Sequence, residues 1–354
     1  MNLRQQVGQL IIAGVEGPEL TAIERAWLKL LRPGGVILFR RNIEDASQVT
    51  ALLRDVTEIA GAPLFRCVDL EGGLVDRLRD LTAPMPSAAA VFATGKHKNF
   101  VKHGKLIGQE AKALGFNTVF APVLDLGLPV SAAVMRTRVV SADPKDVTVY
   151  ALAFVEGLEA EGVLGCGKHF PGLGGGTLDS HETMPRIERT WRELWEQDLA
   201  VFRALAPRLP MMMVAHAAYP KVRDMVPASI SPYWISTVLR KRVGFSGLVV
   251  SDDMEMGGIL AQASIEEAAV KAVLAGMDVI EICKDPALVL RAYEALLTEA
   301  ERSAAFRRRV EAAARRVVKH KNRYLDAAMP RPASAAQIEK LRTKVKRFAE
   351  DVGT

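Results

Sequence analysis

Short runs of apolar, often β-branched residues recur along the chain and alternate with segments of helical periodicity. The runs are almost continuously apolar, which is typical of strands buried on both faces of a parallel sheet. Segments such as DASQVTALLRDVTEIAG and SIEEAAVKAVLAG instead place apolar residues three and four apart, which predicts amphipathic helices. The strand candidates are residues 7–14, 34–39, 63–70, 117–126, 162–170, 211–219, 247–254 and 278–283.

Eight predicted strands that alternate with helices favour an α/β fold, a (β/α)8 barrel of the TIM type, over an open doubly wound sheet. No GxGxxG follows the first strand, and the GLGGG after the fifth lacks a P-loop lysine, so nucleotide binding has no support. The pattern changes near MPRPAS. We therefore expect a single catalytic barrel over residues 1–328 and a C-terminal amphipathic helical tail over residues 329–354.

The predicted tail has a narrow apolar face that must be covered. Ser334 and Gln337 are spaced as a capping box at its start. The cover is either the chain's own barrel or a helix of a second subunit, because so regular a seam also suits a coiled coil. The chain is accordingly expected to be a monomer or a weak dimer. The apolar face consists of Ile338, Leu341, Val345, Phe348 and Val352.

Composition places the chain in an ordinary globular class. Of its 354 residues 49% are hydrophobic and 25% charged. Cys67, Cys166 and Cys283 are far apart in apolar runs, which predicts reduced core thiols in a reducing compartment. The N-terminal apolar run is too short for a signal peptide, and nowhere do 18 apolar residues run together. We expect a cytoplasmic protein with no membrane segment.

The formal charge of +6 is concentrated at one end of the chain. From Glu301 onward there are 15 Lys and Arg against 6 Asp and Glu, a balance of +9, so the first 300 residues carry −3. No stacking aromatic residues separate the basic residues of FRRRVEAAARRVVKHKNRYL. A solvated helical face is therefore expected, with no nucleic acid as partner.

Ionisable residues mark the ends of five consecutive predicted strands. In (β/α)8 barrels the active site lies at the carboxyl ends of the strands, so these side chains should meet at one mouth. The glycine-rich stretch KHFPGLGGGTLDSHETMP adds Asp179 and His181 on a loop. The residues at the strand ends are Asp69, Asp125, Lys168, His169, His216, Asp252 and Asp253.

Among the reactions that such a mouth could perform, glycoside hydrolysis fits the residues best. No HExxH or HxH spacing supports a metal site, and no GxSxG motif supports a serine hydrolase. A retaining glycosidase needs a carboxylate nucleophile and a proton donor. Asp252 suits the first role, and His181, steadied by Asp179, could donate and accept a proton near neutral pH.

The order of motifs resembles the bacterial β-N-acetylhexosaminidases of glycoside hydrolase family 3. The resemblance extends from about residue 7 to about residue 325, and its barrel fold agrees with the periodicity. The motifs are LRPGGVILFRRN (31–42), VDLEGGLVDRL (68–78), FAPVLDL (120–126), KHFPG…DSHETMP (168–185), AHAAYP (215–220), VPASIS (226–231), GFSGLVVSDDMEM (244–256) and LAGMDVI (274–280).

The resemblance implies a role for each matching position. Asp252 matches the nucleophile, His181 the acid/base and Asp179 its partner. The implied activity is that of a retaining exo-β-N-acetylglucosaminidase that releases terminal N-acetylglucosamine, from muropeptides during peptidoglycan recycling, with a small carbohydrate as its only partner. No metal and no cofactor are implied. The residues that match the sugar-binding positions are Asp69, Arg77, Arg138, Lys168 and His169.

The sequence departs from the family pattern at three places. The loop reads PGLGGGT where the family usually has PGHGDT, Val139-Val140 replace Ser-Phe after the arginine, and Leu74 replaces the arginine of EGGR. These changes affect the expected aglycone preference.

A family 3 β-glucosidase, a β-N-acetylglucosaminide phosphorylase and a catalytically silent sugar-binding barrel are the alternatives. The first usually takes its acid/base from a second domain, whereas this sequence supplies a DSH histidine.

Overall fold

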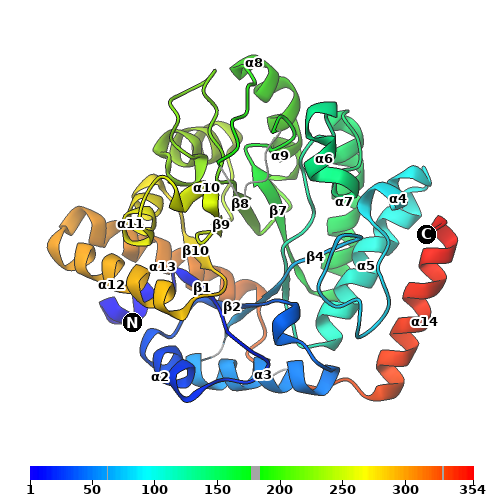
Figure 1. Cartoon of the computed structure of the whole chain (residues 1–354), viewed down its shortest axis with the longest axis horizontal. Coiled ribbons are helices and arrows are strands. Elements are labelled where there is room, and N and C mark those ends of the chain that lie inside the picture. The colour runs from blue at the N-terminus through cyan, green and yellow to red at the C-terminus, as the bar shows by residue number, and fades with distance from the viewer. Residues whose placement is uncertain (62, 177–183, 329–330) are drawn as a thin grey trace.

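A closed barrel of eight parallel strands forms the centre of the computed structural model, which describes residues 1–61, 63–176, 184–328 and 331–354 (Figure 1). Each of the eight predicted runs contains one barrel strand, so the predicted fold class is confirmed. Around the barrel the strands follow the order β1-β10-β9-β8-β7-β6-β3-β2. Their bounds are β1 Ile11–Gly14, β2 Gly35–Leu38, β3 Phe65–Val68, β6 Thr118–Val119, β7 Leu164–Phe170, β8 Met211–Val214, β9 Leu248–Asp253 and β10 Val279–Ile282.

The interior of the barrel is packed with side chains rather than hollow. Alternate residues of each strand point inward, so every strand gives the interior one or two apolar groups. The three cysteines are free and buried, as the sequence predicts. Fully or almost fully buried interior residues include Ile12, Ile37, Phe65, Cys67, Phe120, Cys166, Met211, Met213, Leu248, Val250 and Val279.

Helices surround the barrel, and local sequence signals fix their ends. The Asp45 carboxylate accepts the backbone N–H groups of Ser47 and Gln48, which starts α3, and Ser264 caps α11 in the same way. The bounds are α1 Leu3–Gly8, α2 Ala22–Leu31, α3 Ala46–Ala60, α4 Ala88–Ala93, α5 His97–Ala113, α6 Ala132–Met135, α7 Pro144–Glu161, α8 Trp191–Glu193, η4 Leu194–Asp198, α9 Leu199–Leu205, η6 Tyr233–Val243, α10 Gly257–Leu260, α11 Ile265–Ala275, α12 Pro286–Arg302, α13 Ala304–Tyr324 and α14 Ala335–Val352, with the short 3₁₀ turns η1 Arg40–Asn42, η2 Pro129–Ser131, η3 Arg136–Arg138 and η5 Ala228–Ile230.

A small antiparallel hairpin, which the strand pattern did not predict, follows β3. It pairs β4 (Leu70–Gly72) with β5 (Val75–Asp76). Its turn needs glycine, because Gly72 has φ +83° and a Cβ there would lie 2.2 Å from the carbonyl oxygen of Pro86. Gly73 has φ +61°. The EGG sequence thus folds the chain back so that Glu71 is held in the interior of the protein.

The tail helix α14 packs against α5 on the outside of the barrel, at the right of Figure 1. Leu341, Val345 and Phe348 are buried there, and the predicted capping box at Ser334 is present. The Arg342 guanidinium donates to the carbonyl oxygens of Leu81 and Thr82. Within this chain its own barrel covers the apolar face. In the described residues no helix is long and apolar enough to cross a membrane.

Replacing Phe348 should measure how firmly α14 is held. Its ring is fully buried and lies 6.0 Å from the His103 ring. We expect Phe348→Ala to lower the free energy of unfolding by about 3 kcal/mol, the range for removing a buried aromatic ring. Denaturant titration measures this change. Lys340→Ala, at an exposed position of the same helix, is the control, and equal losses in both variants would contradict the packing described.

Candidate functional site

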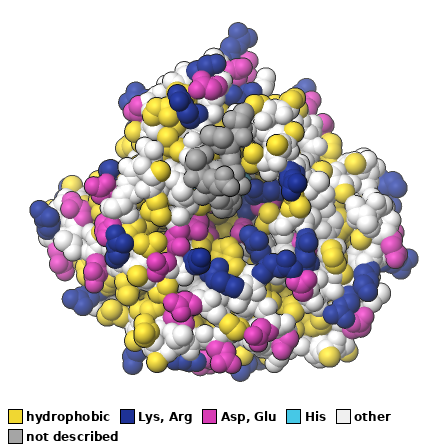
Figure 2. All heavy atoms as spheres, in the orientation of Figure 1, with side chains coloured by type: hydrophobic (Ala, Val, Ile, Leu, Met, Phe, Trp, Pro, Cys, Tyr) yellow, Lys and Arg dark blue, Asp and Glu magenta, His cyan; other side chains and the backbone are white. Residues whose placement is uncertain are grey.

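A cavity of about 560 Å³ opens at the mouth of the barrel, where the strands end. Figure 2 shows basic and acidic side chains gathered around a hollow on this face. Its walls come from segments that are far apart in the sequence, including the ends of β2, β3, β7, β9 and β10, and η3. The polar lining residues are Arg41, Asp69, Glu71, Arg77, Arg138, Lys168, His169, Asp252, Asp253, Glu255, Glu281 and Lys284.

A buried network of ion pairs forms one wall of the cavity. The Lys168 ammonium lies 2.8 Å from Asp69 Oδ1 and 2.7 Å from Glu71 Oε1. Arg138 grips both oxygens of Glu71 through two hydrogen bonds of 2.8 Å. Arg77 adds a looser contact, 3.7 Å from Asp69. Every carboxylate of the network therefore faces at least two cations, which offsets the cost of removing these charges from water.

The network keeps its members ionised. Burial alone would raise the pKa of Glu71, but Arg138 and Lys168 outweigh it and hold that pKa well below its usual range. Burial likewise opposes the charge of Lys168, yet Asp69 and Glu71 raise its pKa above the ordinary value. A rigid, charged set of donors and acceptors is what a polyhydroxylated ligand needs for orientation.

His169 is fixed by a carboxylate behind it. Its Nδ1 lies 2.7 Å from Asp125 Oδ2, and the other carboxylate oxygen accepts the backbone N–H of Leu173 at 2.7 Å. A carboxylate accepts, so His169 Nδ1 carries the proton and the ring orientation is set. Asp125 thus ties β7 to the first residues of the glycine-rich loop.

Asp252 stands at the end of β9 and faces the cavity. Burial would raise its pKa, but His169, His216 and Lys168 together lower it, which favours the carboxylate. His216 braces this strand end, since its Nε2 donates to the Asp253 carbonyl oxygen at 3.0 Å and its Nδ1 accepts the Ser229 hydroxyl at 2.7 Å. Asp252 is therefore an ionised carboxylate on a rigid support.

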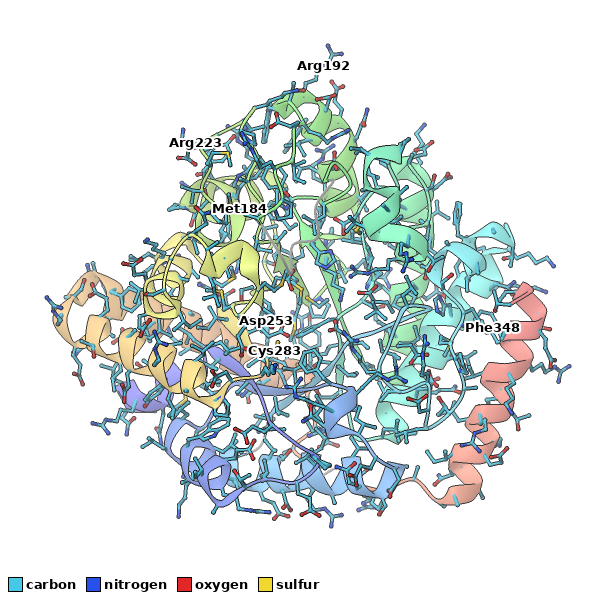
Figure 3. All side chains as sticks on the ribbon, viewed as in Figure 1. Met184, Arg192, Arg223, Asp253, Cys283 and Phe348 are labelled. Atoms are coloured by element: carbon cyan, nitrogen blue, oxygen red, sulfur yellow. The ribbon has the colours of Figure 1, made fainter. Side chains whose placement is uncertain are left out.

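Asp253 differs from Asp252 because burial dominates its pKa. Burial, with help from the carboxylates of Glu255 and Asp252, raises its pKa to about 7. Its Oδ1 accepts the backbone N–H groups of Glu255 at 3.0 Å and Cys283 at 3.3 Å. Figure 3 labels Asp253 and Cys283 close together near the centre of the barrel mouth, whereas Arg192 and Arg223 lie at the periphery.

The whole barrel matches one protein family. Residues 2–320 fit the family described as "Glycosyl hydrolase family 3 N terminal domain". The chain therefore belongs to glycoside hydrolase family 3. It is a glycoside hydrolase, and the resemblance found in the sequence is confirmed.

Relatives of this family 3 chain include proteins of known structure. A β-hexosaminidase of Tolumonas auensis is 37% identical over 281 residues, which cover 78% of this chain and 83% of that protein. A family 3 β-N-acetylglucosaminidase of Paenibacillus has a TM-score of 0.90 at 31% identity, over 99% of this chain and 69% of that one. NagZ of Neisseria gonorrhoeae, solved with N-trifluoroacetyl-D-glucosamine, has a TM-score of 0.74 at 30% identity, over 87% and 97% of the two chains.

The family 3 cavity brings together most of the residues singled out in the sequence. Those that line it are Asp69, Arg77, Arg138, Lys168, His169, Asp252 and Asp253. Asp179 and His181 lie outside the described residues. Leu173 and Gly176, two of the departures from the family loop, line the cavity, while Leu74 is half exposed and does not.

Sequence reasoning missed three acidic residues of the lining, Glu71, Glu255 and Glu281. Glu71 lies within the VDLEGG motif, and its position before a double glycine was the available signal. Glu281 lies inside an apolar strand, DVIEIC, where a lone carboxylate was the signal. Among the described residues no group of three or more His, Cys, Asp or Glu is placed to hold a metal ion.

The raised pKa of Asp253 predicts a pH-dependent stability effect. An unfolded aspartate ionises near pH 4, whereas folded Asp253 stays protonated to about pH 7, so its contribution to stability is lost between these values as the pH rises. Asp253→Asn retains the acceptor oxygen without the charge. We expect its melting temperature to equal that of the native chain at pH 4 and to exceed it by several degrees at pH 8.

Calorimetric melts at pH 4, 6 and 8 check this expectation. Asp285→Asn is the control, because Asp285 is an exposed helix cap with an Oδ1 that also accepts a backbone N–H. A difference for Asp253→Asn that shrinks as the pH rises would contradict the assignment.

Proposed function

We propose that this chain is a retaining exo-β-N-acetylglucosaminidase that releases terminal N-acetylglucosamine from peptidoglycan fragments, in cell-wall recycling in the cytoplasm. The observation that carries the proposal is the convergence of Asp252 and five sugar-binding candidates on one cavity. The names of the relatives support the sugar: several are β-hexosaminidases or β-N-acetylglucosaminidases.

In the proposed first step, an oxygen of Asp252 attacks the anomeric carbon of the sugar. The bond to the leaving-group oxygen breaks, and His181 gives that oxygen a proton, so that a glycosyl ester forms on Asp252. In the second step His181 takes a proton from water, which attacks the same carbon and frees Asp252. Two displacements restore the original anomeric configuration. Asp179 orients and stabilises the His181 imidazolium in this scheme.

The side chains of the buried cavity wall bind the sugar in this scheme. Asp69 offers acceptors, Arg138 and Lys168 offer donors, and Arg77 and His169 complete the set. Because Glu71 and Asp125 hold Arg138, Lys168 and His169 in place, little side-chain entropy remains to be lost on binding. These residues are proposed to orient the ring hydroxyls so that the anomeric carbon faces Asp252.

The rim of the cavity supports an anionic aglycone such as a muropeptide. Arg41 lies over the Phe39 ring at 4.8 Å and donates to the carbonyl oxygens of Val15 and Cys283. Lys284 is exposed on the same side. Neither cation has a carboxylate partner among the described residues, so both can meet the carboxylates of a peptide stem.

Loss of Asp252 tests the chemistry. Asp252→Ala should reduce kcat on an aryl β-N-acetylglucosaminide by on the order of 10³-fold or more, because no covalent intermediate can form. A 2-fluoro sugar that traps the intermediate should label Asp252, located by peptide mapping. Asp253→Asn is the matched control and should label normally. A label on another residue, or faster turnover of the aryl β-glucoside than of the N-acetylglucosaminide, would contradict the proposal.

Lys284 tests the aglycone. Lys284→Gln should raise KM for a muropeptide with free peptide carboxylates by roughly 2- to 5-fold, the size of one exposed ion pair. KM for the neutral aryl substrate should not change. Lys271→Gln, exposed on α11 and absent from the cavity, is the control. An equal change in KM for both substrates would show that Lys284 does not recognise the anionic group.

A further inference from the structure

One acidic side chain of the cavity has no role in the scheme above. Glu281 lies on β10, where alternate residues point into the barrel: Val279 and Cys283 belong to the interior, while Ile280 and Ile282 pack against the surrounding helices. By this alternation Glu281 points inward, and it lines the floor of the cavity with only 3% of its surface exposed. The neighbouring interior positions are apolar, so a carboxyl group here is out of pattern.

Only one of the two carboxyl oxygens of Glu281 has a hydrogen-bond partner among the described residues. Oε1 accepts the thiol of Cys283 at 3.0 Å, whereas the buried Oε2 has no hydrogen-bond partner among the described residues. The described residues also give Glu281 no ion pair, in contrast to Glu71, which pairs with Arg138 and Lys168. A buried polar atom without a partner is costly, and such atoms are few in folded proteins. A leucine at this position would carry no such cost.

Burial and the surrounding charges favour the protonated form of this carboxyl group. Burial, followed by the nearby charges of Asp69, Asp253 and Asp252, raises its pKa well above the ordinary value. A protonated carboxyl both donates and accepts a hydrogen bond. A sugar hydroxyl does the same, so the two groups can pair in a way that an ionised carboxylate or an ammonium group cannot.

We propose that Glu281 is a substrate-binding residue, whose carboxyl group forms a hydrogen bond with the sugar hydroxyl that lies deepest in the cavity. The partnerless oxygen is then satisfied when the sugar is bound. This inference rests on the proposed function, because it takes the occupant of the cavity to be N-acetylglucosamine.

Three variants separate this role from a structural one. Glu281→Leu removes both hydrogen-bonding oxygens, and Glu281→Gln keeps a neutral donor and acceptor. Glu110→Leu is the matched control: Glu110 is 1% exposed, its Oε1 accepts the Thr82 hydroxyl, and its Oε2 also lacks a partner among the described residues. Glu110 lies on α5 and does not line the cavity.

The readouts are the Kd for N-acetylglucosamine by calorimetry, KM and kcat on an aryl β-N-acetylglucosaminide, and the melting temperature. We expect Glu281→Leu to raise Kd and KM by roughly 5- to 10-fold, as for one lost hydrogen bond, with little change in kcat. Glu281→Gln should stay within about 2-fold of the native chain. Glu110→Leu should leave Kd and KM unchanged. If the leucine variant does not fold by circular dichroism, Glu281→Met replaces it.

Deoxy sugars identify the bonded hydroxyl. One of the 3-, 4- and 6-deoxy forms of N-acetylglucosamine should have a higher Kd for the native chain than N-acetylglucosamine itself has. For Glu281→Leu, the Kd values of that deoxy form and of N-acetylglucosamine should be equal. Equal Kd values for the native chain and a folded Glu281→Leu, or no such coupling for any hydroxyl, would overturn the assignment of Glu281 alone. A native chain that does not bind N-acetylglucosamine would overturn the proposed function and this inference with it.

Discussion

The ammonium group of Lys168 is the charge on which the mouth of this barrel depends. It lies within 2.8 Å of carboxylates from two neighbouring segments, Asp69 after β3 and Glu71 on β4, and it comes itself from β7. A buried charge without a partner is strongly destabilising, and separating these segments would leave such a charge behind. Arg138 on η3 also binds the Glu71 carboxylate, so a fourth segment is held in place. The wall is rigid because movement of any one segment would leave a charge on another without its partner.

This arrangement also decides the state of the carboxylates across the cavity. The nearby side chains of His169, His216 and Lys168 lower the pKa of Asp252 and favour its ionised form, although the group is buried. Burial dominates the pKa values of Asp253 and Glu281, and nearby carboxylates raise them further. Three acids within one mouth therefore have different protonation behaviour, and the difference comes from their neighbours rather than from their chemical type. Such divergence is a common property of sites that perform acid and base chemistry.

The remainder of the molecule supports the mouth from outside. Asp125 and His216 do not line the cavity, but each supports a neighbouring strand end, Asp125 by a hydrogen bond to the His169 ring and His216 by one to the Asp253 carbonyl oxygen. The hairpin β4–β5 carries Glu71 and requires the conformations of Gly72 and Gly73. Farther out, α14 supports α5 and bonds the loop after Leu81, which leads from the hairpin to α4.

Sequence alone determined the barrel and most of the polar residues that line the cavity. Eight continuous apolar runs that alternate with helices favour a closed barrel over an open doubly wound sheet, and strand ends in such a barrel converge, so Asp69, Lys168 and Asp252 could be placed at one mouth without coordinates. The motifs also supplied Arg77 and Arg138. The partners of these residues could not be predicted, because the contacts of Glu71 and Asp125 join positions 44 to 97 residues apart, which periodicity does not encode. That the pKa of Asp252 is lowered while those of Asp253 and Glu281 are raised likewise depends on burial and on distances between strands, and only the tertiary structure decides those.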